Sequence, residues 1–429
     1  MQGRLSLSHI HLSIHRSLPF HSKARNFELA CNQQYMQGKI RGFMHLDNGQ
    51  ESIPGLIDYA IKNEDKKYSY YREHCHAIAS GVDPKLVMAE LCMKESGLCK
   101  GAGGSMHIFD KPRYFQGGWA LVAEQLPYAT GAAKSILIER ALGISDDETL
   151  SKQDLPPPTD DDRISVVFVG EGGAQNGRLT ELLNAAAKDK LPLLIINIDN
   201  GRAINTFTDD VSANREVYRA GERYGVPGIY VNGANAEDVA KAGKAVVDYV
   251  RKGKGPAILQ VHTYRFMGHS PADPENERGR KDEKMWARAE QDPVRIFEEK
   301  YTSRGVFTED ELKAARKEVM AKIKEAVQFS DESTMPKGEL AFELEYPDAI
   351  DTDYNARPPP YFAQEVNQRT ISPEQMVAIN EHLEVMYAKS NAGELTIAEA
   401  MNLAIHEEML RDPTTTMHAE DLQAGSSCE

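Results

Sequence analysis

The 429-residue sequence lacks several features that would place it in a common class of protein. Its 50 lysines and arginines are outnumbered by 65 acids, and the net charge of −15 argues against nucleic acid or an anionic membrane as main partner. No apolar run approaches the ~18 residues that a membrane-spanning helix needs. The five cysteines form no C-x-x-C pair, so free thiols in a reducing compartment are expected. The phosphate-binding pattern G-x-x-x-x-G-K-[ST] is also absent.

Acidic residues are missing from residues 1–27, although they are abundant elsewhere. This segment carries Arg4, Arg16, Lys23 and Arg25, together with several histidines and serines. One interpretation of this composition is a transit peptide for the mitochondrial matrix or a plastid. The alternative is a disordered basic tail or a wrongly assigned start of the sequence. Without a transit peptide, a cytoplasmic location is expected.

Residues 164–204 hold the pattern on which the functional interpretation depends. The β-branched and aromatic run 164–169 predicts a strand buried on both faces of a parallel sheet. Gly170-Glu171-Gly172 ends this run and an amphipathic helix follows. The apolar run 193–198 predicts a second buried strand, which ends in Asp199-Asn200-Gly201. Both turns should therefore lie at the carboxyl edge of one sheet, where doubly wound folds bind ligands.

The two turns supply oxygen ligands that suit a hard cation. Glu171 offers a carboxylate and Asn200 an amide oxygen, which together could hold Mg²⁺ or Ca²⁺ against a phosphate. The glycines allow the backbone to approach that phosphate, and the following helix points its amino end at it. A dinucleotide pattern G-x-G-x-x-G from Gly170 fails, because Gln175 stands at its last position. On these residues alone, a ligand-free glycine turn is the alternative.

The remaining apolar patterns alternate between strands and helices. We predict helices over 84–94, 128–141, 236–252 and 309–329 and from 395 onward, a short helix over 215–224, and strands over 229–231 and 255–263. Strands that alternate with helices indicate a parallel sheet covered on both faces.

Five segments resemble one known family. The Gly-Glu-Gly triplet and the dipeptide Asp199-Asn200 resemble the thiamine-diphosphate motif. Four more segments, in order, are similar to the alpha subunit of the thiamine-diphosphate-dependent decarboxylating component of 2-oxo-acid dehydrogenase complexes; they are 42–51, 71–76, 101–107 and 264–274. The resemblance covers about residues 26–300. It implies an α/β thiamine-diphosphate-binding fold with a central, mainly parallel sheet and helices on both faces.

The resemblance implies a role for each matching residue. For Mg²⁺, the ligands are the side chains of Glu171 and Asn200 and the carbonyl of Arg202; the family has Asp at position 171 and usually Asn at 199. The cofactor-binding set is Tyr71 and Arg72 at the diphosphate, Ala120 and Val122 at the aminopyrimidine, Gly172 and Gly173, Ile204 as an apolar wedge, and His269. The catalytic candidates are His45, His107 and His269.

Other polar residues are interpreted more plainly. His74, His76 and His262 are taken as structural. Ser105 and Ser270 are not taken as nucleophiles, because no Ser-His-acid pattern accompanies them. Ser270 matches a loop that is phosphorylated in some family members, and a phosphate there should obstruct binding of the cofactor's own phosphates.

The implied activity is oxidative decarboxylation of a 2-oxo acid, pyruvate first, with acyl transfer to lipoyl-lysine. The implied partners are a beta subunit, in an alpha2beta2 assembly, and a lipoyl-bearing acyltransferase. The beta subunit would supply the glutamate that activates the cofactor, so the chain alone should turn over little. The alternatives are an acetoin dehydrogenase-type subunit, a transketolase-like enzyme, or a degenerate assembly or regulatory subunit, which Glu171 and Ala120 favour.

Four regions follow from these patterns. Residues 1–25 form the basic or transit-like segment and residues 26–329 the cofactor-binding domain. An acidic and proline-rich linker is expected over 330–393. Residues 394–429 resemble the opening of the family's beta subunit, cut short, and an unrelated tail helix is the alternative.

Overall fold

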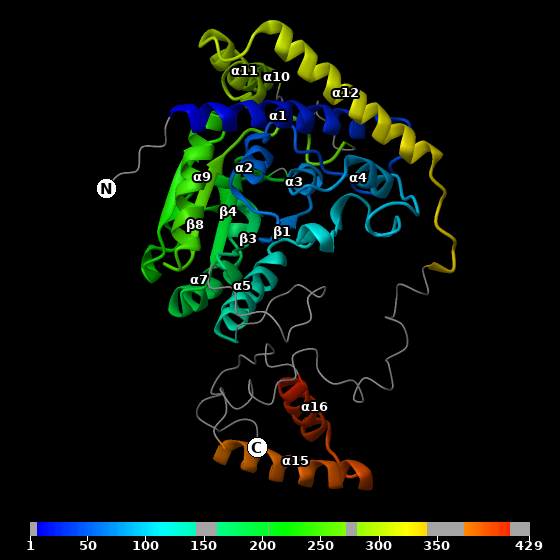
Figure 1. Ribbon diagram of the computed structural model, residues 1–429, viewed down its shortest axis with the longest axis vertical. Coiled ribbons are helices and arrows are strands. Elements are labelled where there is room, and N and C mark those ends of the chain that lie inside the picture. The colour runs from blue at the N-terminus through cyan, green and yellow to red at the C-terminus, as the bar shows by residue number, and fades with distance from the viewer. Residues whose placement is uncertain (1–6, 143–160, 205, 272–280, 341–372, 412–429) are drawn as a thin grey trace. The chain divides into compact units, whose positions relative to one another are not determined.

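A six-stranded parallel sheet with the order β2-β1-β3-β4-β8-β7 forms the centre of the protein. The computed structural model describes residues 7–142, 161–204, 206–271, 281–340 and 373–411 (Figure 1). The strands are β1 (Lys66–Tyr70), β2 (Phe115–Trp119), β3 (Ser165–Gly170), β4 (Leu193–Asp199), β7 (Gly228–Asn232) and β8 (Ala257–His262). An antiparallel pair, β5 (Arg202–Ala203) and β6 (Thr206–Phe207), follows β4. The predicted α/β class is confirmed.

Strands β3 and β4 are adjacent and lie inside the sheet. Every residue of β4 is buried, and so is every residue of β3 except Gly170. Their sequences are mostly apolar, with Ser165, Asn197 and Asp199 as buried polar exceptions. Such sequences fit this position, because a central parallel strand is covered on both faces. Gly170 pairs with Ile198, so the turns that follow the two strands lie at the same edge, as predicted.

Helices cover both faces of the sheet (Figure 1). One face carries α2 (Ser52–Ala60), α3 (His74–Ala79) and α9 (Ala236–Arg251), with α1 (Leu7–Met36) packed on α2 and α3. The other face carries α5 (Gln125–Leu142) and α7 (Gly177–Asp189), and α6 (Glu171–Ala174) forms the turn after β3. Further helices are α4 (Pro84–Leu91), α8 (Thr208–Val211), α10 (Lys281–Glu290), α11 (Pro293–Ser303) and α12 (Glu309–Glu332). No helix in the described ranges has the length and apolar content needed to cross a bilayer.

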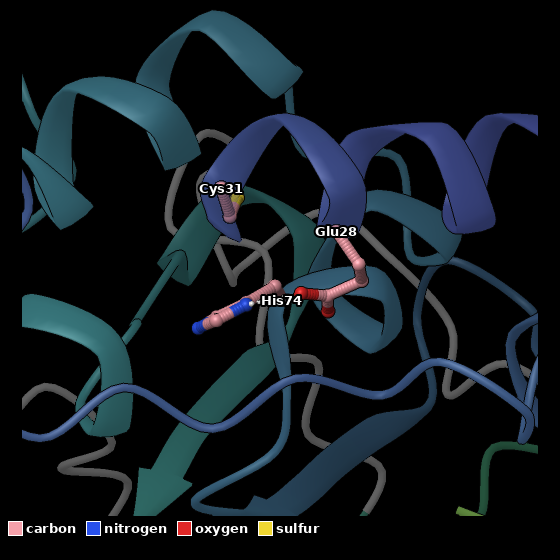
Figure 2. A group of neighbouring side chains, drawn as sticks. All are labelled: Glu28, Cys31 and His74. Atoms are coloured by element: carbon pink, nitrogen blue, oxygen red, sulfur yellow. Dashed lines mark hydrogen bonds and ion pairs between the residues drawn. The ribbon is translucent and has the colours of Figure 1, made fainter. Parts of the chain in front are cut away.

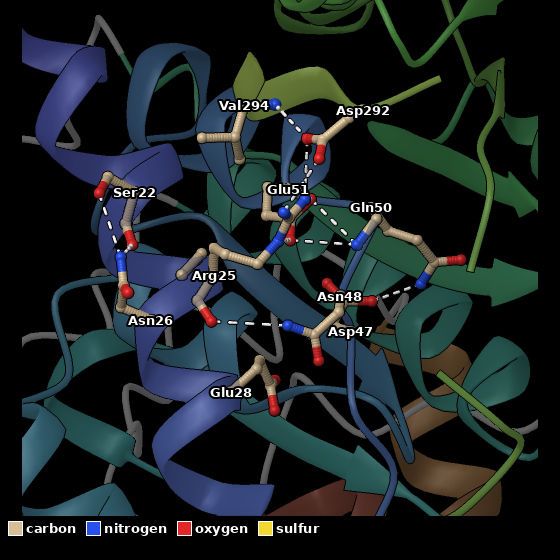
Figure 3. Close-up of polar contacts among 12 residues, drawn as sticks. Ser22, Arg25, Asn26, Glu28, Asp47, Asn48, Gln50, Glu51, Asp292 and Val294 are labelled. Carbon is tan, nitrogen blue, oxygen red and sulfur yellow. Dashed lines mark hydrogen bonds and ion pairs between the residues drawn. The ribbon is translucent and has the colours of Figure 1, made fainter. Parts of the chain in front are cut away.

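The predicted boundary at residue 25 falls inside a helix, because α1 runs from Leu7 to Met36. The contacts of Arg25 join the end of the basic segment to the core. Its guanidinium donates to the buried carboxylate of Glu51 and, at 3.0 Å, to Asp292 (Figure 3). The next apolar residue, Phe27, is fully buried.

Two other predictions need correction. The short helix expected over 215–224 is replaced by two 3-10 turns, Val217–Arg219 and Glu222–Tyr224. The expected linker begins inside α12 and contains a helix, α15 (Pro373–Ala392); its acidic, proline-rich part lies outside the described residues.

Helices α15 and α16 (Ile397–Arg411) belong to a second compact unit. They pack on each other through Leu383, Met386 and Leu403. The helix predicted from residue 395 onward therefore begins at Ile397, and Thr396 and Glu399 cap its first turn. The rest of the segment that resembles the opening of a beta subunit, residues 412–429, lies outside the described residues.

Candidate cofactor and metal site

A cavity of about 390 Å³ opens at the carboxyl edge of β3 and β4. Its walls come from the loop before α2, the segment after β2, the turn after β3 and the β5 hairpin. Most of the predicted site residues line it: His45, Tyr71, Ala120, Val122, Glu171, Gly172, Gly173, Asn200, Arg202, Ile204 and His269. The fold thus brings together residues that are far apart in the sequence, at the edge where the two strand-end turns were expected.

The glycines after β3 stand where a side chain would not fit. A Cβ atom on Gly172 would lie 2.7 Å from the Cβ of Ala203, and one on Gly173 would lie 2.6 Å from Cγ2 of Val169. Real Cβ atoms do not make contacts this short. The turn therefore exposes bare backbone to the cavity, which suits close approach by a phosphate.

Glu171 begins α6 directly after β3 and is 4% exposed. Its Oε2 atom accepts the backbone N–H of Asn200 at 3.3 Å, so the two strand ends are joined by a hydrogen bond. Burial raises the pKa of the Glu171 carboxyl to about 7, and the nearby charge of Asp199 adds to this effect. The carboxyl therefore changes its protonation state near neutral pH.

Asn200 presents an amide oxygen that no group in the described part of the chain uses. Its Nδ2 atom donates to Oε1 of Gln50 at 3.1 Å. Its Oδ1 atom is buried and has no hydrogen-bond partner among the described residues. A buried oxygen without a donor is costly unless a ligand satisfies it. The carboxylate of Glu171 and this oxygen are donors of the kind that a hard divalent cation prefers. Arg202, whose carbonyl is the third predicted ligand, lines the same cavity.

His45 is a neutral imidazole beside the cavity. Burial, with the charges of Arg72 and His269, lowers its pKa to about 2. The ring centroid lies 4.6 Å from that of Tyr71 and 4.7 Å from that of His269. At physiological pH this ring carries no charge. One of its nitrogens can donate a hydrogen bond and the other can accept one.

Residues 21–339 match the family model described as "Dehydrogenase E1 component". The chain belongs to this family. It is 38% identical over 312 residues to the chloroplastic pyruvate dehydrogenase E1 component subunit alpha-3 of Oryza sativa subsp. japonica, covering 73% of this chain and 70% of the relative. It is 34% identical over 330 residues to the E1 component subunit alpha of Porphyra purpurea, covering 76% and 92%. For the Rickettsia felis subunit alpha the identity is 35% over 321 residues, covering 75% and 92%. The resemblance to E1 alpha subunits is confirmed.

Two predicted residues of this E1 chain do not line the cavity. Arg72 is buried beside it, and its guanidinium donates to the carbonyls of Leu46, at 2.8 Å, and His269, at 3.3 Å. Its donors therefore hold two loops of the site together. His107 has an exposed ring, with Nδ1 3.3 Å from the carbonyl of Gly118. This ring is turned to the end of β2. The roles predicted for Arg72 at the diphosphate and for His107 in catalysis stay predictions.

A buried Ser-His-acid chain lies under α1, contrary to the sequence-based expectation for Ser105. His74 Nε2 is 2.7 Å from Ser105 Oγ, and His74 Nδ1 is 3.1 Å from Glu28 Oε2. Cys31 lies beside this pair (Figure 2), and burial raises the pKa of its thiol well above the ordinary value. Both imidazole nitrogens are engaged and all these groups are buried. The cluster is therefore a structural chain of hydrogen bonds. It ends at Ser105, whose Oγ atom accepts the backbone N–H of His45.

Sequence reasoning missed several residues of the E1 site. Gln50 lies within the quoted segment 42–51 but was given no role, although its amide contacts Asn200. Phe43, Trp119, Leu121 and Gln125 also line the cavity. A polar residue inside a matching motif was the only signal for Gln50, and the apolar residues gave none. Ser270 directly follows His269 and is half-buried. Its phosphorylation stays a prediction.

Proposed function

We propose that the chain is the alpha subunit of a pyruvate dehydrogenase-type E1 component and acts in thiamine-diphosphate-dependent decarboxylation of pyruvate. The observation that carries this proposal is the hydrogen bond between Glu171 and Asn200 at the ends of two central strands. It leaves the buried Oδ1 atom of Asn200 without a partner among the described residues. The chain's similarity to alpha subunits of pyruvate dehydrogenase E1 components supports pyruvate over acetoin as the substrate.

The residues of the cavity would divide the binding of thiamine diphosphate and Mg²⁺. The ion would be held against the diphosphate by Glu171, the Oδ1 atom of Asn200 and the carbonyl of Arg202. The turn at Gly172 and Gly173, which has no side chains, would leave room for the phosphate oxygens. When bound, thiamine diphosphate supplies the carbon nucleophile and the electron sink that decarboxylation needs.

Ile204 would set the shape of a bound cofactor. It is a β-branched residue with a φ of +55°, a conformation that such residues rarely adopt, and its side chain lines the cavity. Strained backbone of this kind persists where the surrounding structure holds it for a functional reason. This supports the role of an apolar wedge against which the cofactor bends.

The neutral ring of His45 would act on the substrate. Because its pKa is about 2, it can donate or accept one hydrogen bond without adding charge to the cavity. Its packing against Tyr71 and His269 fixes the plane of the ring. A donor held in this way can stabilise an oxygen that gains negative charge as carbon dioxide leaves.

An exposed apolar rim supports the need for a beta subunit. Phe43, Leu121, Val122 and Ile204 line the cavity and are exposed. Apolar side chains grouped around a site favour coverage by another protein surface. A beta subunit seated on this rim would exclude water from the reaction. The acyl group would then pass to the lipoyl group of the acyltransferase of the complex.

Calorimetric titration with thiamine diphosphate and Mg²⁺, with and without a beta subunit, tests the proposal. We expect binding that requires the ion, and decarboxylation of pyruvate only in the alpha–beta assembly. A degenerate assembly subunit is the second candidate, because Glu171 stands where the family has Asp. Absence of metal-dependent binding in the assembly would favour that candidate and overturn ours.

A plastid location is supported by the chloroplastic rice relative, and a cytoplasmic one by the bacterial relative.

A further inference from the structure

Gln50 is hydrogen-bonded to Asn200, a residue that lines the cavity, and has no exposed surface itself. It belongs to the loop that leads into α2, and Figure 3 shows its amide extending from this loop, with Asp47 bonded to the amide nitrogen. The mechanism above gives it no task. A fully buried primary amide must nevertheless have its donors and acceptor satisfied, so its partners define what it does.

The two ends of this amide have different partners. On the nitrogen side, Nε2 donates to the carboxyl of Asp47 and lies 3.4 Å from the hydroxyl of Tyr70. On the oxygen side, Oε1 accepts from Nδ2 of Asn200 and from Oγ1 of Thr263, both at 3.1 Å. Asp47 thus holds the nitrogen, which leaves the oxygen turned toward β4 and β8.

We infer that Gln50 is a positioning residue that fixes which face of the Asn200 amide points into the metal site. An oxygen acceptor at Gln50 requires the nitrogen of Asn200 on its side. The Oδ1 atom of Asn200 must then point away from Gln50. This atom is buried, belongs to a residue that lines the cavity, and has no partner among the residues that the structure describes. The inference rests on the proposed function, because it assigns this oxygen to the divalent cation.

The orientation matters because an amide has one end that binds a cation and one that repels it. If Gln50 offered no acceptor, the Asn200 side chain could rotate by half a turn and present its NH₂ group to the ion. Loss of a residue that orients a metal ligand typically weakens metal binding by roughly 10- to 100-fold.

The test measures Mn²⁺ binding by electron paramagnetic resonance. The full chain is assembled with a beta subunit and saturated with thiamine diphosphate. We expect Gln50→Met, which removes the acceptor at similar volume, to weaken Mn²⁺ binding by about 10- to 100-fold. Thr263→Val is the matched control: it removes the other donor to the same oxygen and leaves Asn200 bonded, so a change below about threefold is expected.

A second background separates orientation from general damage. Asn200→Asp places an oxygen at both ends of the side chain, so orientation no longer matters. In this background we expect Gln50→Met to change Mn²⁺ affinity by less than about threefold. An equal loss in both backgrounds, or no loss in the otherwise unchanged chain, would overturn the inference. Failure of the unaltered assembly to bind Mn²⁺ would instead overturn the proposed function.

A conservative variant keeps the test decisive if Gln50→Met does not fold. Gln50→Glu retains an oxygen acceptor for Asn200 and Thr263, and its second oxygen can share a proton with Asp47, whose pKa is raised by burial. We expect Mn²⁺ affinity within about threefold of the unaltered chain. A loss of about tenfold or more in this variant, with an unchanged circular dichroism spectrum, would contradict the inference.

Discussion

Glu171 makes a prediction about stability at the scale of one residue. Its carboxyl has a pKa near 7 in the folded protein and an ordinary value of 4.5, so the folded state binds more protons between these limits. The free energy of unfolding without metal should therefore fall as pH rises from 4.5 to 7. Relative to the unaltered chain, Glu171→Gln should gain up to about 3 kcal/mol over this window.

Urea denaturation of both proteins at pH 4.5 to 8, without divalent metal, measures this difference. Taking the difference between the two proteins removes the contributions of groups that titrate in both. Parallel pH curves would show that the Glu171 carboxyl is not destabilised by its surroundings. The same variant, at pH 8 with Mg²⁺, should lose the metal-dependent binding of thiamine diphosphate, since a neutral amide replaces the only acid of the proposed ligand set.

The turn at Gly173 gives a second test at this scale. In Gly173→Ala the new Cβ would meet Cγ2 of Val169 at 2.6 Å, and β3 cannot easily move because it is buried on both faces. We expect destabilisation of about 1–3 kcal/mol and weaker cofactor binding. Gly131→Ala is the matched control, because no atom of the described residues outside its own stretch of helix lies within 4 Å of its Cβ position. Equal thermal unfolding midpoints for the two variants would contradict the packing argument.

At the scale of elements, Arg25 ties α1 to the loop before α2 and to the start of α11. Arg25→Met should leave the buried carboxylate of Glu51 without its cation and cost about 3–5 kcal/mol. Lys39→Met breaks an exposed ion pair with Asp331 and should cost less than about 1 kcal/mol. Chemical denaturation measures both values. Similar losses for the two variants would show that the Arg25 pair does not stabilise the docking of α1.

Elements were predictable where their own residues carry the pattern. Strands β3, β4 and β8 and helix α9 were found because apolar residues recur with the right period. Strands β1 and β2 were missed, since β1 begins with two lysines and β2 contains two glycines. Their burial depends on distant partners: in β1, for example, the buried Lys67 lies opposite Val166 of β3.

The site shows the same division between local and tertiary information. Glu171 and Asn200 were predicted to lie together because each directly follows a recognisable strand. The roles of Arg72 and Gln50 depend on groups far along the chain, such as the carbonyl of His269 and the amide of Asn200. A motif shows that such residues matter, but their partners become visible only once the chain is folded.

At the scale of the whole molecule, the cavity belongs to a unit that is separate from α15 and α16. The family match also ends at residue 339. We therefore expect a chain that ends at residue 340 to bind thiamine diphosphate and Mg²⁺ as tightly as the full chain, when each is assembled with a beta subunit. Calorimetry measures both affinities. A loss of more than about tenfold, or 1.4 kcal/mol, on truncation would mean that the C-terminal helices contribute to the site.

The central claim is that the ends of β3 and β4 jointly hold one divalent cation. The most direct measurement is anomalous diffraction from crystals of the alpha–beta assembly grown with Mn²⁺ and thiamine diphosphate. We predict one manganese peak within about 2.5 Å of both a Glu171 carboxylate oxygen and the Oδ1 atom of Asn200. A peak bound elsewhere, or bound cofactor with no manganese at these two residues, would contradict the account.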